Sequence, residues 1–533
     1  MSETLANPQA ASAPAPKHSR LAWLDALRGF AALCVVFDHG STLMLMPVRD
    51  FLYRWLDLGQ YGVFVFFLIS GYIIPASLER KGSVRGFWTS RLFRLYPMYL
   101  VALVIAAVTY ETGYGTLRGA EHHPAQSVFA WLLMLPNLLT GPNVPNVTWT
   151  LSYEMVFYLL LVALFSWGVH RRSGSYATVF AVGAVALGGV LPMAALTHWA
   201  GHADHGGLAL NATADALVLG GILLAVSSRS RVARAGAAVA GLTALVLVMV
   251  NQGSPSPWEG CVILALMFTG TLIYRTQQRQ PGTSRPVTAA IVVGVLALTT
   301  FAGLWHGQQR HMSHQWLIQW ATSVLLAGAT FGLGLAASHR RVPRWCAWLG
   351  MISFSVYLLH PLVFDAYRDV PVLHRPHTFG VQVLMFAGCL AVIIGLSAVC
   401  YYLVERPMQR LGRRLSGRGG GGGSSEPAAL AAGGSVGQTG QSVGQTGQLV
   451  GQTGQLVGQT GQLVGQAGQL VGQAGQPVDS ATGAATGAAT GSGSAATDAG
   501  SGRDTDSDRP GAPTAARSAS SSSAVAGGSG ASP

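Results

Sequence analysis

Arg28 and His39 are the residues whose types and spacing most directly indicate chemistry in this sequence. Both lie in the apolar stretch 21–46, LAWLDALRGFAALCVVFDHGSTLMLM, eleven residues apart. That spacing is close to three turns of an α-helix, so we expect both side chains on one face with a rise of roughly 16 Å between them. A cation and an imidazole are costly inside a membrane helix unless they are used. The pair therefore predicts a membrane-embedded proton-transfer site with an anion anchor beneath it.

His39 is the candidate general base, because a neutral imidazole can take a proton from a hydroxyl near neutral pH. Glu154, in WTLSYEMVFYLL, and His360, in SFSVYLLHP, fall at a similar predicted depth on two other helices. We expect Glu154, together with His360 or Tyr357, to orient His39 or the substrate. The alternatives are a structural hydrogen-bonding role for a lone intramembrane histidine and a structural salt bridge for Glu154.

A second candidate group is basic. Arg91 and Arg94 form RLFR at the entry of the third predicted helix, three residues apart and so on one face. Arg28 adds a third cation on the same side of the membrane, with Asp25 one turn before it as its candidate holder. Arginine binds phosphate in a bidentate manner. The cluster predicts a clamp for a phosphate-bearing donor, and the alternative is that Arg91 and Arg94 only determine topology.

Composition identifies the elements that must position these groups. The chain has 533 residues, of which 50% are hydrophobic and 10% charged, whereas a soluble domain carries roughly 25% charged residues. Apolar runs long enough to cross a bilayer follow one another between residues 21 and 405. We therefore predict an all-α polytopic transmembrane bundle of about 10–12 spans. Twelve segments qualify: 21–46, 59–78, 95–110, 149–168, 177–198, 207–227, 235–251, 258–274, 287–305, 316–337, 347–365 and 380–404.

Alternate loops carry most of the arginine and lysine residues. This pattern predicts that those loops and both termini lie on the cytoplasmic side of a bacterial cell membrane. The net charge of +12 is attributed to this topology, and no nucleic-acid partner is expected. The segment 127–141 is too short and too interrupted by proline to span, so we expect it to be interfacial or re-entrant. The basic loops are 80–94, 170–172, 229–234, 275–285, 339–344 and 406–418.

The two ends of the chain differ from the apolar part. Residues 1–20 are predicted to be a flexible cytoplasmic segment, residues 21–410 the membrane domain, and residues 411–533 a disordered low-complexity tail. A seven-residue repeat of the type VGQTGQL begins at Val436, and its glycines argue against a coiled coil. The five cysteines lie within or beside apolar segments without a CxxC pair, so no metal site is expected.

Seven motifs in order give the sequence a resemblance to the acyltransferase-3 family of integral membrane acyltransferases. The resemblance implies transfer of an acyl group, commonly acetyl, from cytoplasmic acyl-CoA to a hydroxyl of a carbohydrate such as an exopolysaccharide or another surface glycan. It also implies that Arg28 and His39 match the family's Arg–His pair, Arg91 and Arg94 its RxxR element, and Glu154 its helix-four acidic motif. The motifs are LDALRGFAALCVVFDH, GVFVFFLISGYII, RLFRLYPMYL, WTLSYEMVFYLL, DALVLGGILLA, ISFSVYLLHPLV and VERP.

The sequence also departs from this pattern and leaves other functions open. Met155 stands where some members carry a second acidic residue, so Glu154 is the one candidate in that motif. The acceptor could equally be a sugar on a macrolide-type secondary metabolite. Buried ionisable residues would also fit a glycan transporter or flippase. A scaffold that presents the glycine-rich tail is the remaining alternative.

Overall fold

The computed structural model describes residues 22–111, 124–139, 141–187, 194–196, 204–251, 256–369 and 378–418. Within these ranges the chain is helical and contains no strand, which confirms the predicted all-α class. Residues 1–20 and 419–533, predicted to be flexible or disordered, lie outside the described residues. Residues 411–418, placed in the tail by composition, form the end of a helix.

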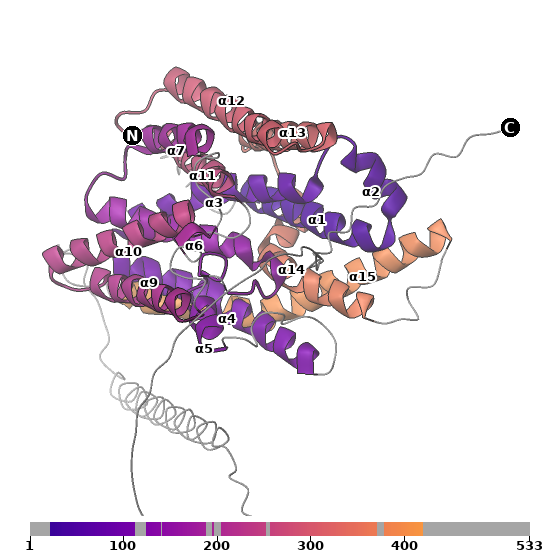
Figure 1. Ribbon diagram of the computed structural model, residues 1–533, viewed down its shortest axis with the longest axis horizontal. Helices are drawn as coiled ribbons and strands as arrows, with labels where there is room; N and C mark the ends of the chain where they lie inside the picture. Colours follow the sequence, from indigo (N-terminus) through magenta and orange to yellow (C-terminus); the bar gives the residue numbers. More distant parts are fainter. Residues whose placement is uncertain are drawn as a thin grey trace, which may run out of the picture. The chain divides into compact units, whose positions relative to one another are not determined.

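Figure 1 shows the arrangement of the described helices. The bounds are α1 Ala22–Met44, α2 Met46–Tyr53, α3 Leu58–Lys81, α4 Val84–Glu111, α5 Pro124–Leu132, η1 Asn146–Thr148, α6 Trp149–Ser166, α7 Ser173–Leu187, α9 Asp204–Ala225, α10 Ser230–Val250, α11 Pro257–Gln277, α12 Arg285–Gln309, α13 His314–Ala336, α14 Arg344–Arg368, α15 Phe379–Cys400, η3 Tyr401–Glu405 and α16 Arg406–Arg418.

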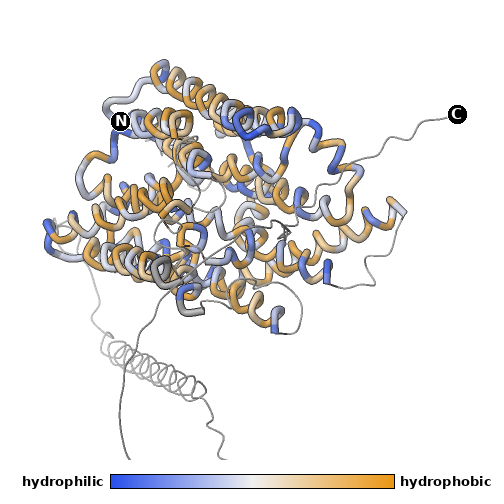
Figure 2. Tube along the Cα trace, viewed as in Figure 1, coloured by the Kyte–Doolittle hydropathy of each residue, from blue (hydrophilic) through white to orange (hydrophobic). Residues whose placement is uncertain are grey.

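Nine of the described helices are long and apolar enough to cross a membrane. The three other predicted spans fall on α1, α7 and α9. Helix α1 has 23 residues but carries Asp25, Arg28 and Asp38, whose charges lower its apolar character. The apolar parts of α7 and α9 are shorter, at Ser173–Leu187 and Ala209–Ala225. Hydrophobic residues dominate along the helices in Figure 2, as expected for a bundle surrounded by lipid.

Helix α4 begins eleven residues earlier than the predicted span 95–110, at Val84. Its first turns are held by packing, because the side chains of Phe87 and Trp88 are buried and α16 lies against this part of the helix. The prediction that Arg91 and Arg94 stand at the entry of the helix is therefore wrong. Arg91 lies about two turns and Arg94 nearly three turns inside α4.

Helix α1 packs between α3 and α14. The contact with α14 is close because glycines meet there: a β-carbon on Gly350 would lie 1.8 Å from the carbonyl oxygen of Asp25, and one on Gly29 would lie 2.9 Å from the Gly350 nitrogen. Close backbone approach through glycine is typical of packed membrane helices. This contact brings the residues of α1 that suggest chemistry against the face of α14 that carries His360.

Candidate active site

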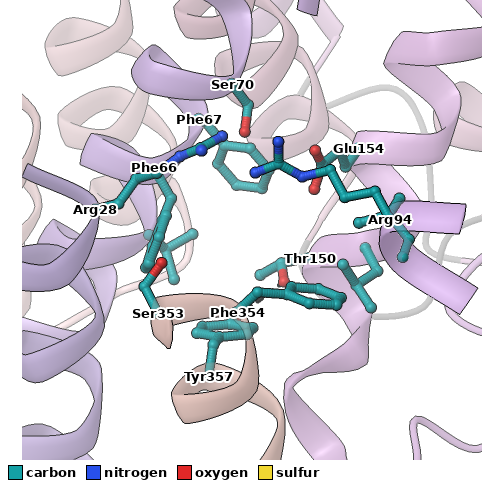
Figure 3. Close-up of a pocket in the computed structure, with 13 residues that line it drawn as sticks. Arg28, Phe66, Phe67, Ser70, Arg94, Thr150, Glu154, Ser353, Phe354 and Tyr357 are labelled. Carbon is teal, nitrogen blue, oxygen red and sulfur yellow. Dashed lines mark hydrogen bonds between the residues drawn. The ribbon is translucent and has the colours of Figure 1, made fainter. Parts of the chain in front are cut away.

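One cavity lies inside the bundle, lined by Arg28 near the start of α1 and by the middle of α14, and we call it the inner cavity. Its volume is about 80 Å³ and its walls come from α1, α3, α4, α6 and α14. Figure 3 shows the guanidinium groups of Arg28 and Arg94 converging from opposite walls beside the carboxylate of Glu154. Tyr357 lies at the other end of the same cavity. The cavity thus combines two cations and one anion with an otherwise largely apolar lining.

Arg28 is the centre of the charge network around this cavity. It interacts electrostatically with Arg94 and Arg91, and with the carboxylates of Asp25 and Glu154. Two arginines side by side repel each other, and the two carboxylates offset part of that repulsion. An anion entering between Arg28 and Arg94 would gain charge-assisted hydrogen bonds from both. Asp25 lies close enough to Arg28 to interact with it electrostatically, and its role as the holder of Arg28 stays a prediction.

Arg91 occupies a different environment from Arg94. Its side chain is 5% exposed, and its guanidinium carbon lies 5.4 Å from the ring centres of both Phe87 and Tyr158. Cation–π contacts of this kind stabilise a buried charge. Tyr158 in turn donates a hydrogen bond of 2.5 Å to Oε1 of Glu154. Arg91 therefore supports the wall of the inner cavity, while Arg94 lines it.

Glu405 is a further charged residue of this region to which the sequence analysis assigned no role. Its side chain is 3% exposed and accepts hydrogen bonds from Ser355 Oγ at 3.0 Å and Gln409 Nε2 at 2.9 Å. Its carboxylate interacts electrostatically with Arg94 and Arg28. The π-helical turn Tyr401–Glu405 is a common device at functional sites. The motif VERP was the signal in the sequence that pointed to Glu405.

A second cavity, which we call the outer cavity, contains His39. Its volume is about 420 Å³, within the range of sites that bind small molecules. Its lining combines aromatic side chains with acidic and amide groups, and no lysine or arginine is among them. The lining residues besides His39 are Val35, Asp38, Asp57, Gly59, Gln60, Val63, Phe64, Asn143, Val147, Trp149, Glu259, Ile263, Trp320 and Tyr357.

His39 and His360 form a direct pair across the contact between α1 and α14. Nδ1 of His39 lies 2.9 Å from Nε2 of His360, and Nδ1 of His360 lies 3.1 Å from the carbonyl oxygen of Val356. A carbonyl oxygen only accepts, so the proton of His360 is on Nδ1 and its Nε2 accepts from His39. His39 therefore keeps its own proton on Nδ1, and its Nε2 is left with a free lone pair.

The two cavities share Val63 and Tyr357 in their linings. The Tyr357 hydroxyl lies 2.9 Å from Thr150 Oγ1, and both residues are buried. Tyr357 thus stands as a wall between the arginine pair and the histidine pair. Arg28 lines the inner cavity and His39 lines the outer one.

Glu154 lines the inner cavity and is absent from the lining of the outer one. The structure therefore brings His39 together with His360 and leaves Glu154 with the arginines, which differs from the expectation that all three converge. The difference arises from the rotation of each helix about its own axis. The sequence predicts how deep a residue lies along its helix, but it does not predict which neighbouring helix the side chain contacts. The orienting position beside His39 belongs to His360.

Three carboxylates of the outer cavity were not anticipated: Asp38, Asp57 and Glu259. Asp57 accepts from the Gln60 amide at 2.8 Å at the start of α3, and Glu259 accepts from the Ser256 amide at 2.5 Å at the start of α11. For Asp57 and Glu259, helix-capping patterns in the sequence were the available signal. Within the part of the chain that the structure describes, no group of histidine, cysteine and acidic residues is arranged to hold a metal ion.

Comparison with known proteins assigns the chain to a class. The family model described as an acyltransferase domain matches residues 21–402. The chain therefore belongs to the acyltransferase-3 family, and the family named by the sequence resemblance is confirmed.

Individual relatives match over shorter stretches of the chain or at lower identity. The acyltransferase MdmB of Streptomyces mycarofaciens is 35% identical over 27% of this chain and 39% of its own length. BcsY of Komagataeibacter xylinus, which carries the name of a membrane-bound transacylase, is 25% identical over 72% of this chain and 81% of its own. The O-acetyltransferase OatA of Staphylococcus aureus is 26% identical over 31% of this chain and 28% of its own length. The chain spans less than half the length of the first curated relatives it matches, and no solved structure matches.

Proposed function

We propose that this chain is a membrane O-acyltransferase. It would move an acyl group, acetyl in the first instance, from cytoplasmic acyl-CoA to a hydroxyl of a carbohydrate such as an exopolysaccharide or another cell-surface glycan. Membership of the acyltransferase-3 family supports the reaction class. The observation that carries the proposal is the line of two cavities, with an arginine pair in one, a histidine pair in the other, and Tyr357 between them.

The inner cavity has the chemistry of a donor site. Arg28 and Arg94 present guanidinium groups that suit the phosphates or the thioester arm of acyl-CoA. The roughly 16 Å rise along α1 from Arg28 to His39 is comparable with an extended pantetheine arm. A cavity of about 80 Å³ admits a narrow chain, so the arm would enter and displace the side chains around Tyr357. Glu154 and Glu405 keep the two arginines in place in this arrangement.

The outer cavity would hold the acceptor. Nε2 of His39 takes the proton of the attacking hydroxyl while the hydroxyl oxygen bonds to the thioester carbonyl carbon. The carbon–sulfur bond then breaks, and the thiolate of CoA receives that proton from His39. His360 accepts the hydrogen bond from His39 Nδ1, which favours the tautomer with a basic Nε2 and stabilises the imidazolium that forms.

The test uses membranes that contain the full chain, supplied with radiolabelled acetyl-CoA. We expect label in a carbohydrate fraction with the wild type and at least about 100-fold slower labelling with His39→Ala at equal protein level. His314→Ala is the matched control, because His314 is exposed at the start of α13, away from both cavities. Equal labelling by wild type and His39→Ala would overturn the mechanism. Label that stays in acetyl-CoA with every variant would overturn the reaction class.

A further inference from the structure

A third cavity lies between the hairpin α12–α13 and the helices α1, α3 and α11. Its volume is about 950 Å³, the largest among the cavities considered, and it shares no lining residue with the inner or the outer cavity. It lies at the end of the bundle where α1 and α12 begin and α3, α11 and α13 end. Figure 1 shows α12 and α13 lying together along one edge of the bundle. We call this cavity the hairpin groove.

The depth of the hairpin groove matches one leaflet of a bilayer. On α12 its lining runs from Arg285 to Val293, and on α13 from Gly328 to Ala336. Each stretch advances eight residues, a rise of about 12 Å. Half of the hydrocarbon core is about 15 Å thick. With the helix ends at the membrane surface, a groove of this length reaches about the middle of the bilayer.

Polarity changes along the same direction. Arg285, Gln277 and His339 stand at the helix ends, at the surface level. Val292, Val293 and Phe331 line the deeper part. Trp23 closes the back wall through edge contacts with Tyr72 and Phe331, each at a ring-centre distance of 5.8 Å. The groove is therefore polar where a lipid head group lies and apolar where its acyl chains lie.

The groove contains surface that the described protein leaves uncovered. Val293 is 67% exposed although it points into the groove. A β-carbon built on Gly332 meets no atom within 4 Å. Arg285 is exposed, and it forms none of the ion pairs found among the described residues. A hydrophobic wall with an unneutralised cation at its mouth fits an amphiphile with a negative head group.

We infer that the hairpin groove is a binding site for an anionic phospholipid of the adjoining leaflet. The phosphate pairs with Arg285, His339 and Gln277 border the head group, and an acyl chain lies along Val292, Val293 and Phe331. The bound lipid fills the space between α12–α13 and the rest of the bundle. This site is independent of the proposed acyl transfer, because no residue of the inner or outer cavity takes part in it.

The test measures lipid binding by the purified full-length protein in detergent. Native mass spectrometry counts retained phosphatidylglycerol and phosphatidylcholine, and the shift in melting temperature is recorded for each lipid. We expect the wild type to retain phosphatidylglycerol preferentially and to be stabilised by it. Arg285→Gln should weaken phosphatidylglycerol binding on the order of tenfold, as expected for loss of one charged hydrogen bond. Arg231→Gln, an exposed arginine at the start of α10 outside the groove, should not.

A second variant tests the apolar part without touching the charge. Gly332→Leu places a side chain in the open space of the groove and should exclude the acyl chain. Gly388→Leu on α15, where a β-carbon also meets nothing within 4 Å, is its control. Equal retention of the two lipids by the wild type would overturn the inference. So would equal weakening by Arg285→Gln and Arg231→Gln, which indicates general surface charge, or unchanged binding by Gly332→Leu.

Discussion

Nδ1 of His39 lies 2.9 Å from Nε2 of His360, although the two residues are 321 positions apart in the sequence. The pair joins α1 to α14, and His360 is itself fixed by its bond to the carbonyl of Val356. His360 thus holds the place that a carboxylate occupies in many hydrolytic triads. Because His360 is neutral when it accepts, the pair carries at most one positive charge during the proposed reaction.

Removal of the base is the first prediction. His39→Ala should lower the rate of acyl transfer about 10²–10⁴-fold, the usual contribution of general-base catalysis. The melting temperature should stay close to that of the wild type, because His39 is only partly buried. Transfer assays and thermal unfolding in the same detergent measure both quantities. A folded His39→Ala protein with the wild-type rate would contradict the role given to His39.

The partner of the base gives a second prediction. His360→Ala leaves Nδ1 of His39 without its acceptor, so the ring is free to rotate and to change tautomer. Loss of alignment at a reacting centre costs on the order of 10²-fold in kcat, while KM for acyl-CoA should not change. His360→Gln, whose amide oxygen can accept from His39, should recover part of the rate. An unchanged kcat in His360→Ala would show that the pair is not used in catalysis.

The pH dependence follows from the same geometry. A base must be unprotonated to act, so transfer by the wild type should fall as the pH falls through the titration of His39. The expected slope of log kcat/KM on the acid side is one, for one proton. In His39→Ala this acid limb should disappear from the residual rate. A limb that persists in His39→Ala would assign the titration to another group.

The donor site gives a third change to test. Arg94→Gln removes one guanidinium from the inner cavity and should raise KM for acyl-CoA. Hydrogen bonds to charged groups contribute about 1.5–3 kcal/mol, which corresponds to a rise of about 10–100-fold. Arg94→Lys should recover only part of the loss, because lysine lacks the bidentate geometry. Arg85→Gln, exposed at the start of the same helix, should behave as the wild type, and an equal rise there would contradict the site.

Tyr357 is predicted to separate the donor and acceptor cavities. Tyr357→Ala removes the ring that both cavities share and should admit water to the thioester. The ratio of acyl-CoA hydrolysis to transfer is therefore expected to rise, while total thioester cleavage persists. Tyr357→Phe keeps the ring and should keep the wild-type ratio. If Tyr357→Ala transfers without added hydrolysis, the ring does not act as a barrier.

The close contact between α1 and α14 gives a stability prediction. Gly350→Ala places a β-carbon 1.8 Å from the Asp25 carbonyl oxygen, so the two helices must separate. Overpacking of this kind costs about 1–3 kcal/mol, and it should also slow transfer because His39 and His360 sit on the separated helices. Gly388→Ala, with open space around it, should leave the melting temperature unchanged or raise it. Equal effects of the two variants would contradict the role of the contact.

Several features could be read from the sequence without the fold. Apolar runs separated by basic loops predict the helices, because lipid requires every backbone group to be bonded within its own segment. Helical periodicity places Arg28 and His39 on one face of α1. Ordered motifs identify the family, and the family model confirms it. Each of these depends on local sequence or on the order of segments, both of which a linear chain contains.

Tertiary structure decided which side chains meet. His39 pairs with His360, and Glu154 turns to the arginine cavity, because rotation of each helix about its axis is set by packing with its neighbours. Packing also extended α4 to Val84 and brought Glu405 near Arg94 and Arg28. The hairpin groove likewise arises from the spacing of five helices, a quantity that no single segment determines.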